Sequence, residues 1–199
     1  MKKIYLYAVA ITLAFASCDV NDEQAQKPMD YQSKTTSQGQ VDIATLYKDL
    51  IRTYNAPAVM TNAIALTSFQ NHALNNAIFR SIANQEDYEA INISEFETVL
   101  SSDISLVNTL NYKLIVKSYI KRIIDCEDNL YSAITNDVNL TKEERYFLVN
   151  CYLVSNSTSD GTPNNWKKSK TIAFAYGYQK SLAQAIMYAG AVEILNNQI

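Results

Sequence analysis

The chain has 199 residues and a formal net charge of −3, from 17 basic and 20 acidic side chains. This mildly acidic balance argues against binding to DNA or RNA, because that binding needs a basic surface to neutralise phosphates. The length suits one domain with a sizeable core, and the small numbers of glycines (four) and prolines (three) favour long helices over a turn-rich all-β fold.

The first 17 residues have the three parts of a secretory signal peptide. Two lysines follow Met1, residues 4–15 form an apolar run with one threonine, and two small residues end the segment. An apolar run of about a dozen residues is too short for a stable membrane-spanning helix but suits a signal peptide. We therefore expect residues 1–17 to be removed and to take no part in the fold.

The stretch Leu13-Ala14-Phe15-Ala16-Ser17-Cys18 resembles the lipobox of bacterial lipoproteins, in which an aliphatic residue and two small residues precede a cysteine. Phe15 stands where leucine is usual, and the resemblance covers only the start of the chain. It implies that Cys18 receives diacylglycerol and becomes the first residue of the mature protein. Two or more acyl chains hold a protein stably on a bilayer. The expected partner is therefore the membrane, bound through this lipid anchor.

Residues 18–40 are expected to form a flexible tether, because they are rich in polar side chains and lack any apolar period. Asp19, Asp22 and Glu23 resemble the acidic surface-export signal of Bacteroidetes lipoproteins. In enterobacteria, an aspartate directly after the cysteine instead resembles an inner-membrane retention signal. The expected location is the bacterial cell envelope, with the outer membrane favoured and its periplasmic or surface face left open.

Residues 41–199 predict an all-α domain, a single bundle of about six helices, because apolar side chains recur at helical spacing and no strand alternation competes. Two capping-box patterns, beginning at Ser94 and Thr141, mark helix starts, and Pro57 is typical of a first helical turn. The expected helices cover residues 41–55, 57 to between 83 and 88, 94–101, 103–134, 141–154 and 166–197.

Cys126 and Cys151 would lie level with each other if the chain forms an antiparallel hairpin that turns near Val138. Both fall on apolar stripes, and an exported protein can form disulfides. The alternative is a pair of buried thiols that pack as small apolar groups. Packed helix axes lie about 8–10 Å apart, and few positions on two such helices meet the distance that a disulfide needs. Both interpretations stay open.

The last expected helix has one charge, Lys180, between residues 172 and 192. A charge near the middle of a membrane span is costly, so we expect a buried core helix and not a span. At the start of this helix, Trp166, Lys167 and Lys168 form an aromatic and basic cluster. Such side chains suit an interface with a protein, peptide or glycan. The alternative is a tryptophan that only packs the preceding loop onto the domain.

His72 is the single histidine, and the sequence has no His-Glu-x-x-His or Glu-x-x-His pattern. We therefore expect no metal and no cofactor. The favoured function is a non-enzymatic, lipid-anchored envelope protein with a helical binding domain, such as an accessory subunit or an inhibitor. The alternative is a hydrolase of envelope polymers, resembling a lytic glycosidase, which needs two carboxylates about 5–9.5 Å apart. Its candidate acids are Asp125, Glu127, Glu143 and Glu144.

Overall fold

The structure is a computed structural model that describes residues 41–157 and 164–197. Every regular element in these two ranges is an α-helix, which confirms the predicted all-α fold. The predicted signal peptide, Cys18 and the predicted tether lie outside the described residues.

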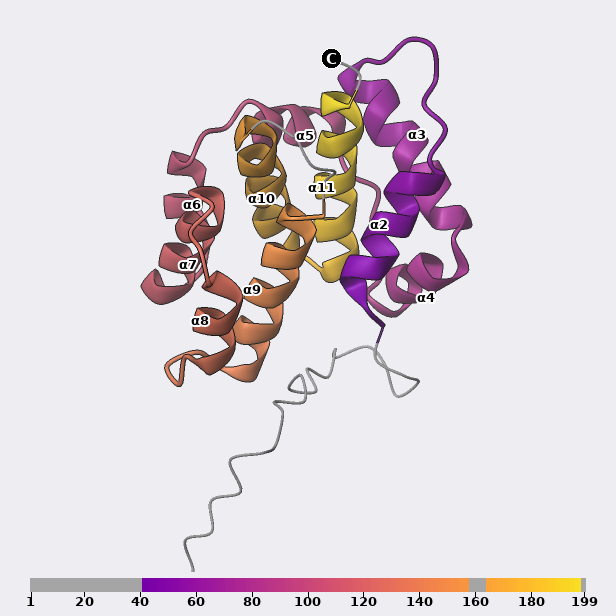
Figure 1. Cartoon of the computed structure of the whole chain (residues 1–199). Helices are drawn as coiled ribbons and strands as arrows, with labels where there is room; N and C mark the ends of the chain where they lie inside the picture. The colour runs from indigo at the N-terminus through magenta and orange to yellow at the C-terminus, as the bar shows by residue number, and fades with distance from the viewer. Residues whose placement is uncertain (1–40, 158–163, 198–199) are drawn as a thin grey trace, which may run out of the picture. The chain divides into compact units, whose positions relative to one another are not determined.

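Ten helices cover the described ranges, where about six were expected. Figure 1 shows α10 and α11 side by side, with α2, α3 and α4 on one side of them and α6, α7 and α8 on the other. The higher number arises because three of the expected long helices are interrupted. The helices are α2 (Ile43–Thr53), α3 (Asn62–Asn75), α4 (Ala77–Gln85), α5 (Ile93–Leu100), α6 (Ser105–Thr109), α7 (Leu114–Ile124), α8 (Leu130–Asn136), α9 (Lys142–Ser155), α10 (Asn164–Tyr178) and α11 (Leu182–Asn196).

The helix expected to begin at Pro57 is in fact two helices, α3 and α4, separated at Asn76. The Asn76 side chain accepts hydrogen bonds from the backbone N–H groups of Ile78 and Phe79, at 2.9 and 3.1 Å. These N–H groups have no partner within their own helix, so the asparagine starts α4 and ends α3. The start was also predicted wrongly, because α3 follows an N-cap at Thr61 and Pro57 lies in the loop before it.

The single helix expected over residues 103–134 is wrong, since α6, α7 and α8 occupy this stretch. Cys126 and Asn129 both have a φ angle of 57°, which the interior of a right-handed helix does not allow. Both residues lie between α7 and α8. The apolar period of the sequence therefore continues across a break in the helix.

The last expected helix, over residues 166–197, is a hairpin of α10 and α11. Ser181 is the N-cap of α11, and its hydroxyl oxygen accepts a hydrogen bond of 3.1 Å from the backbone N–H of Gln184. The two helices approach closely at Gly177, where a Cβ atom would stand 2.7 Å from the carbonyl oxygen of Gln184. Lys180 lies exposed in the turn between them.

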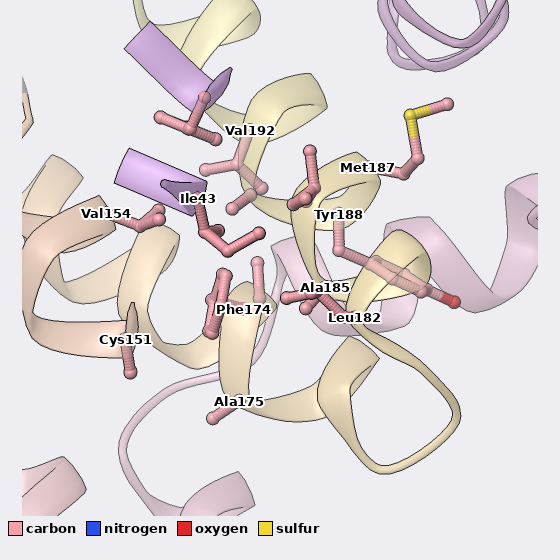
Figure 2. Close-up of a cluster of buried hydrophobic side chains, with 14 of the residues drawn as sticks. Ile43, Cys151, Val154, Phe174, Ala175, Leu182, Ala185, Met187, Tyr188 and Val192 are labelled. Carbon is pink, nitrogen blue, oxygen red and sulfur yellow. The ribbon is translucent and has the colours of Figure 1, made fainter. Parts of the chain in front are cut away.

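α11 lies in the hydrophobic core, and every residue from Leu182 to Ile194 is buried. This burial confirms the prediction of a core helix. Figure 2 shows Val192 of α11 close to Ile43 of α2 and Phe174 of α10. Among the described helices, none is both long and apolar enough to cross a membrane.

Helices α2, α5 and α9 lie close to where the sequence predicts them, because local capping interactions begin them. Asp42 caps α2 by accepting a backbone N–H hydrogen bond of 3.1 Å. Thr141 and Glu144 form the predicted capping box at the start of α9. The cap of α5 differs from the prediction, because Asn92 and not Ser94 accepts the hydrogen bond there.

Candidate functional site

A buried polar cluster joins three helices through Tyr47 of α2, Lys170 of α10 and Glu193 of α11. The Tyr47 hydroxyl donates a hydrogen bond of 2.6 Å to Glu193 Oε2. Lys170 Nζ lies 3.1 Å from the same oxygen and 5.7 Å from the centre of the Tyr47 ring. The side chains of Lys170 and Glu193 are 2% and 7% exposed, so this ion pair is almost completely removed from water.

Burial dominates the electrostatics of this cluster. Loss of water lowers the pKa of Lys170, and the neighbouring Glu193 carboxylate offsets part of that effect. Burial also raises the pKa of Tyr47 well above its usual value, and the charge of Glu193 adds to the shift. Replacing a buried ion pair by well-packed apolar side chains is often neutral or stabilising, so this pair is weak evidence for stability of the fold.

This cluster was not predicted from the sequence, although the stretch 172–192 between its two charged residues is nearly free of charge. Lys170 and Glu193 are the charges that flank that stretch, one on each side. Helical spacing does not pair residues 23 positions apart, and only the hairpin of α10 and α11 brings the two together. A charged residue on a core-facing position of each helix was the signal that could have drawn attention to them.

The aromatic and basic cluster lies at the start of α10, and the side chains of Trp166, Lys167 and Lys168 are all half-buried. Lys167 Nζ donates to Asn156 Oδ1 at the end of α9, at 3.5 Å. Lys168 faces Asp103, whose pKa is lowered mainly by a hydrogen bond from the Ser105 hydroxyl and to a lesser degree by the lysine charge. All three side chains are therefore partly accessible, but Lys167 and Lys168 lie towards different neighbours.

The disulfide considered for Cys126 and Cys151 is not formed, and both are free thiols. Cys126 is exposed in the turn after α7 ends at Ile124, so it does not continue the apolar stripe on which its pairing depended. Cys151 is completely buried in α9, and burial raises the pKa of its thiol to about 12. Cys151 thus fits the alternative of a buried apolar thiol, and Cys126 fits neither interpretation.

Two of the four acids considered for a hydrolase, Glu144 and Glu127, are held by basic or capping groups. Glu144 accepts a hydrogen bond from the Thr141 backbone N–H and lies 3.0 Å from Lys113 Nζ. Glu127 lies 2.6 Å from the guanidinium of Arg122. Asp125 ends α7 and Glu143 lies in the first turn of α9, and both are exposed.

The pKa values of Glu127 and Glu144 are shifted downward, whereas a catalytic general acid needs a raised pKa. A hydrogen bond from Arg122 is the main cause that lowers the pKa of Glu127. Burial raises the pKa of Glu144, but the Thr141 backbone and Lys113 outweigh it and the net shift is downward. These acids therefore give the hydrolase alternative no support.

His72 belongs to α3 and is half-buried, and its ring contacts the C-terminal end of α2. Its Nε2 atom lies 3.1 Å from the carbonyl oxygen of Leu50 and 3.2 Å from Thr53 Oγ1. Within residues 41–157 and 164–197, no three side chains of the types His, Cys, Asp and Glu are grouped to hold a metal ion. Comparison of the chain with protein-family models, curated proteins and solved structures gave no match in any of the three.

Proposed function

We propose that this chain is a bacterial envelope lipoprotein, anchored through Cys18, whose helical domain is a non-enzymatic binding module. The pattern Leu13–Cys18 after a charged start and an apolar run is the observation that carries the proposal. The first described helix, α2, begins at Ile43, directly after the polar stretch 18–40. A domain that starts at this position leaves the whole polar stretch available as a tether between the lipid and the fold.

The lipid anchor is tested with the full chain in a bacterial host that processes lipoproteins. Cells are fed an alkyne-tagged fatty acid, and wild type is compared with Cys18→Ser and with Cys126→Ser, which removes an exposed thiol of the described domain. We expect the fatty acid label and membrane partitioning to be lost in Cys18→Ser alone. Retention of both in Cys18→Ser would refute the anchor.

We place the binding surface of the module at the start of α10, on Trp166, Lys167 and Lys168. Tryptophan provides a large contact area and is among the residues that dominate the binding energy of interfaces, and the two lysines add positive charge beside it. All three side chains are half-buried, so contacts with the domain restrict their motion in the free protein. This restriction reduces the conformational entropy that is lost on binding. The partner class is an envelope protein, peptide or glycan that carries acidic groups.

This surface is tested by chemical crosslinking in intact cells, followed by purification and mass spectrometry. The test variant combines Trp166→Ala with Lys167→Glu and Lys168→Glu, and the matched control is Lys48→Glu, on the exposed side of α2. We expect the control to recover the wild-type partner and the test variant to lose at least about 90% of it, since loss of an interface hot spot costs about 2 kcal/mol or more. Equal recovery by both variants would remove the surface from the proposal.

A further inference from the structure

Helix α2 packs on α9 and α11 through one face, and that face covers an ion pair. Four side chains of α2 are buried: Ile43, Leu46, Tyr47 and Leu50. Tyr47 is the one that reaches charged groups, since its hydroxyl donates to Glu193 and its ring lies over Lys170. The surface that α2 covers is therefore ionic at the position of Tyr47 and apolar around Ile43, Leu46 and Leu50.

An ionic surface beneath a helix makes that helix easier to lift. Charged groups regain favourable hydration when they are uncovered, whereas the exposure of apolar groups to water is unfavourable. Burial lowers the pKa of Lys170, which shows that the closed state disfavours its charge. Uncovering the pair relieves this penalty and offsets part of the apolar contact that is lost.

The pair does not depend on α2 for its position. Lys170 and Glu193 belong to the two arms of the hairpin formed by α10 and α11, which touch closely at Gly177. When α2 moves away, the hairpin still holds the ammonium group next to the carboxylate. The surface that α2 leaves is therefore preformed.

The C-terminal end of α2 is held by hydrogen bonds to α3. The Tyr54 hydroxyl shares a hydrogen bond of 2.5 Å with Ser68 Oγ of α3. His72 Nε2, also on α3, lies 3.1 Å from the Leu50 carbonyl oxygen and 3.2 Å from Thr53 Oγ1. Residues 50–54 thus carry the hydrogen bonds from α2 to α3, while Tyr47 contacts the ion pair and Ile43 and Leu46 lie in the core.

We propose that α2 is a strap that pivots at residues 50–54 and lifts from α9 and α11, exposing the Lys170–Glu193 pair without unfolding the other helices. The opening uncovers a groove with apolar edges and a charged floor. Elements of low local stability are the ones that move in binding and regulation. The strap is independent of lipid anchoring and of the surface at Trp166.

The strap is tested by native-state hydrogen exchange with mass spectrometry on the whole Cys18→Ser chain, in increasing denaturant below the unfolding transition. Peptides from α2 are expected to exchange at least tenfold faster than peptides from α9 and α11, with a weaker dependence on denaturant. This measurement needs no substitution within the described domain. If α2, α9 and α11 exchange together with the same denaturant dependence, α2 does not open separately and the proposal fails.

Two variants test the role of the ion pair. Tyr47→Phe combined with Lys170→Met and Glu193→Leu makes this contact fully apolar without leaving the Tyr47 hydroxyl unpaired, and should slow α2 exchange at least tenfold more than it slows exchange in α9. Tyr47→Phe removes the hydroxyl contact and should speed α2 exchange severalfold. The matched control, Ser155→Ala with Thr171→Val, removes a buried hydroxyl pair between α9 and α10 and should not change α2 relative to α9. Unchanged or faster α2 exchange in the apolar variant would overturn the proposal.

Discussion

Gly190 of α11 lies against the ring of Phe69 of α3 so closely that a Cβ atom at position 190 would stand 2.1 Å from Phe69 Cε1. Phe69 is completely buried, so its ring has no free space into which it can move. This close approach sets the distance between α3 and α11.

Gly190→Ala is therefore expected to destabilise the domain even though alanine favours helices by up to about 1 kcal/mol. The added methyl group must push α3 away or force Phe69 from its rotamer, at a cost of about 1–3 kcal/mol or more. Urea denaturation followed by circular dichroism measures the change. Phe69→Leu in the Gly190→Ala background should recover part of the loss. A Gly190→Ala variant as stable as wild type would contradict the observed packing.

The ion pair beneath α2 predicts a strongly non-additive pair of substitutions. Glu193→Leu alone leaves the Lys170 ammonium buried without its carboxylate and should lower the free energy of unfolding by about 3–5 kcal/mol. Adding Lys170→Met removes the isolated charge, so the double variant should recover most of this loss, apart from about 1–3 kcal/mol for the buried Tyr47 hydroxyl that has lost its acceptor. A double variant at least as unstable as Glu193→Leu would show that the lysine is not buried as described. Denaturant unfolding of the four proteins of the cycle gives the coupling energy.

The two described cysteines should differ sharply in reactivity. Cys126 is exposed, whereas Cys151 is completely buried with its thiol pKa raised to about 12, and the thiolate is the reactive species. In the Cys18→Ser protein, a thiol reagent such as DTNB should modify one cysteine within minutes and the second only after denaturant is added. Peptide mapping should identify the first as Cys126. Rapid modification of both thiols in the native protein would be inconsistent with this packing.

The raised pKa of Glu86 leads us to expect a specific pH dependence of the free energy of unfolding. Its carboxylate accepts a hydrogen bond of 2.8 Å from the backbone N–H of Ala183 at the start of α11. Burial has the largest effect on the pKa of Glu86 and raises it above the usual value. Hydrogen bonds from the backbone N–H groups of Ala183 and Leu182 lower the pKa but do not cancel the effect of burial. Because the folded protein binds this proton more tightly than the unfolded chain, Glu86 should make stability fall as pH rises from about 4.5 through the folded pKa.

The check is the unfolding midpoint from pH 4 to pH 8 for wild type, Glu86→Gln and the control Glu89→Gln, which changes an exposed acid of the same loop. Glu86→Gln should remove the decrease that begins above about pH 4.5, whereas Glu89→Gln should follow wild type. If the decrease persists in Glu86→Gln, another group is responsible for it.

The sequence predicted those parts of the fold that depend on residues close together in the chain. The start of α9 follows from Thr141 and Glu144, three positions apart, and the start of α2 follows from Asp42. The breaks at Asn76 and Asn129 were not predictable in the same way, because the apolar period continues across both. Asn76 begins α4 by capping it with its side chain, whereas Asn129 begins α8 through its φ of 57° without a side-chain cap, and asparagine alone does not distinguish these cases from a helix interior.

The candidate site was predictable only in part for the same reason. Trp166, Lys167 and Lys168 are adjacent in the sequence, so a local pattern was enough to bring them together. The cluster of Tyr47, Lys170 and Glu193 depends on contacts between α2 and a hairpin far along the chain. No periodicity of the sequence contains that information, and the position of Cys126 was missed because it depends on where α7 ends.

The mass of the mature N-terminus tests the proposed anchoring most directly. The full chain is expressed in a lipoprotein-processing bacterium, extracted from the envelope with detergent and digested, and its N-terminal peptide is measured by mass spectrometry. We predict a peptide that begins at Cys18 and carries a diacylglyceryl group on its sulfur, with or without a further acyl chain on its amine. A mature chain with an unmodified Cys18, or one that retains residues 1–17, would contradict the assignment of this protein as a lipoprotein.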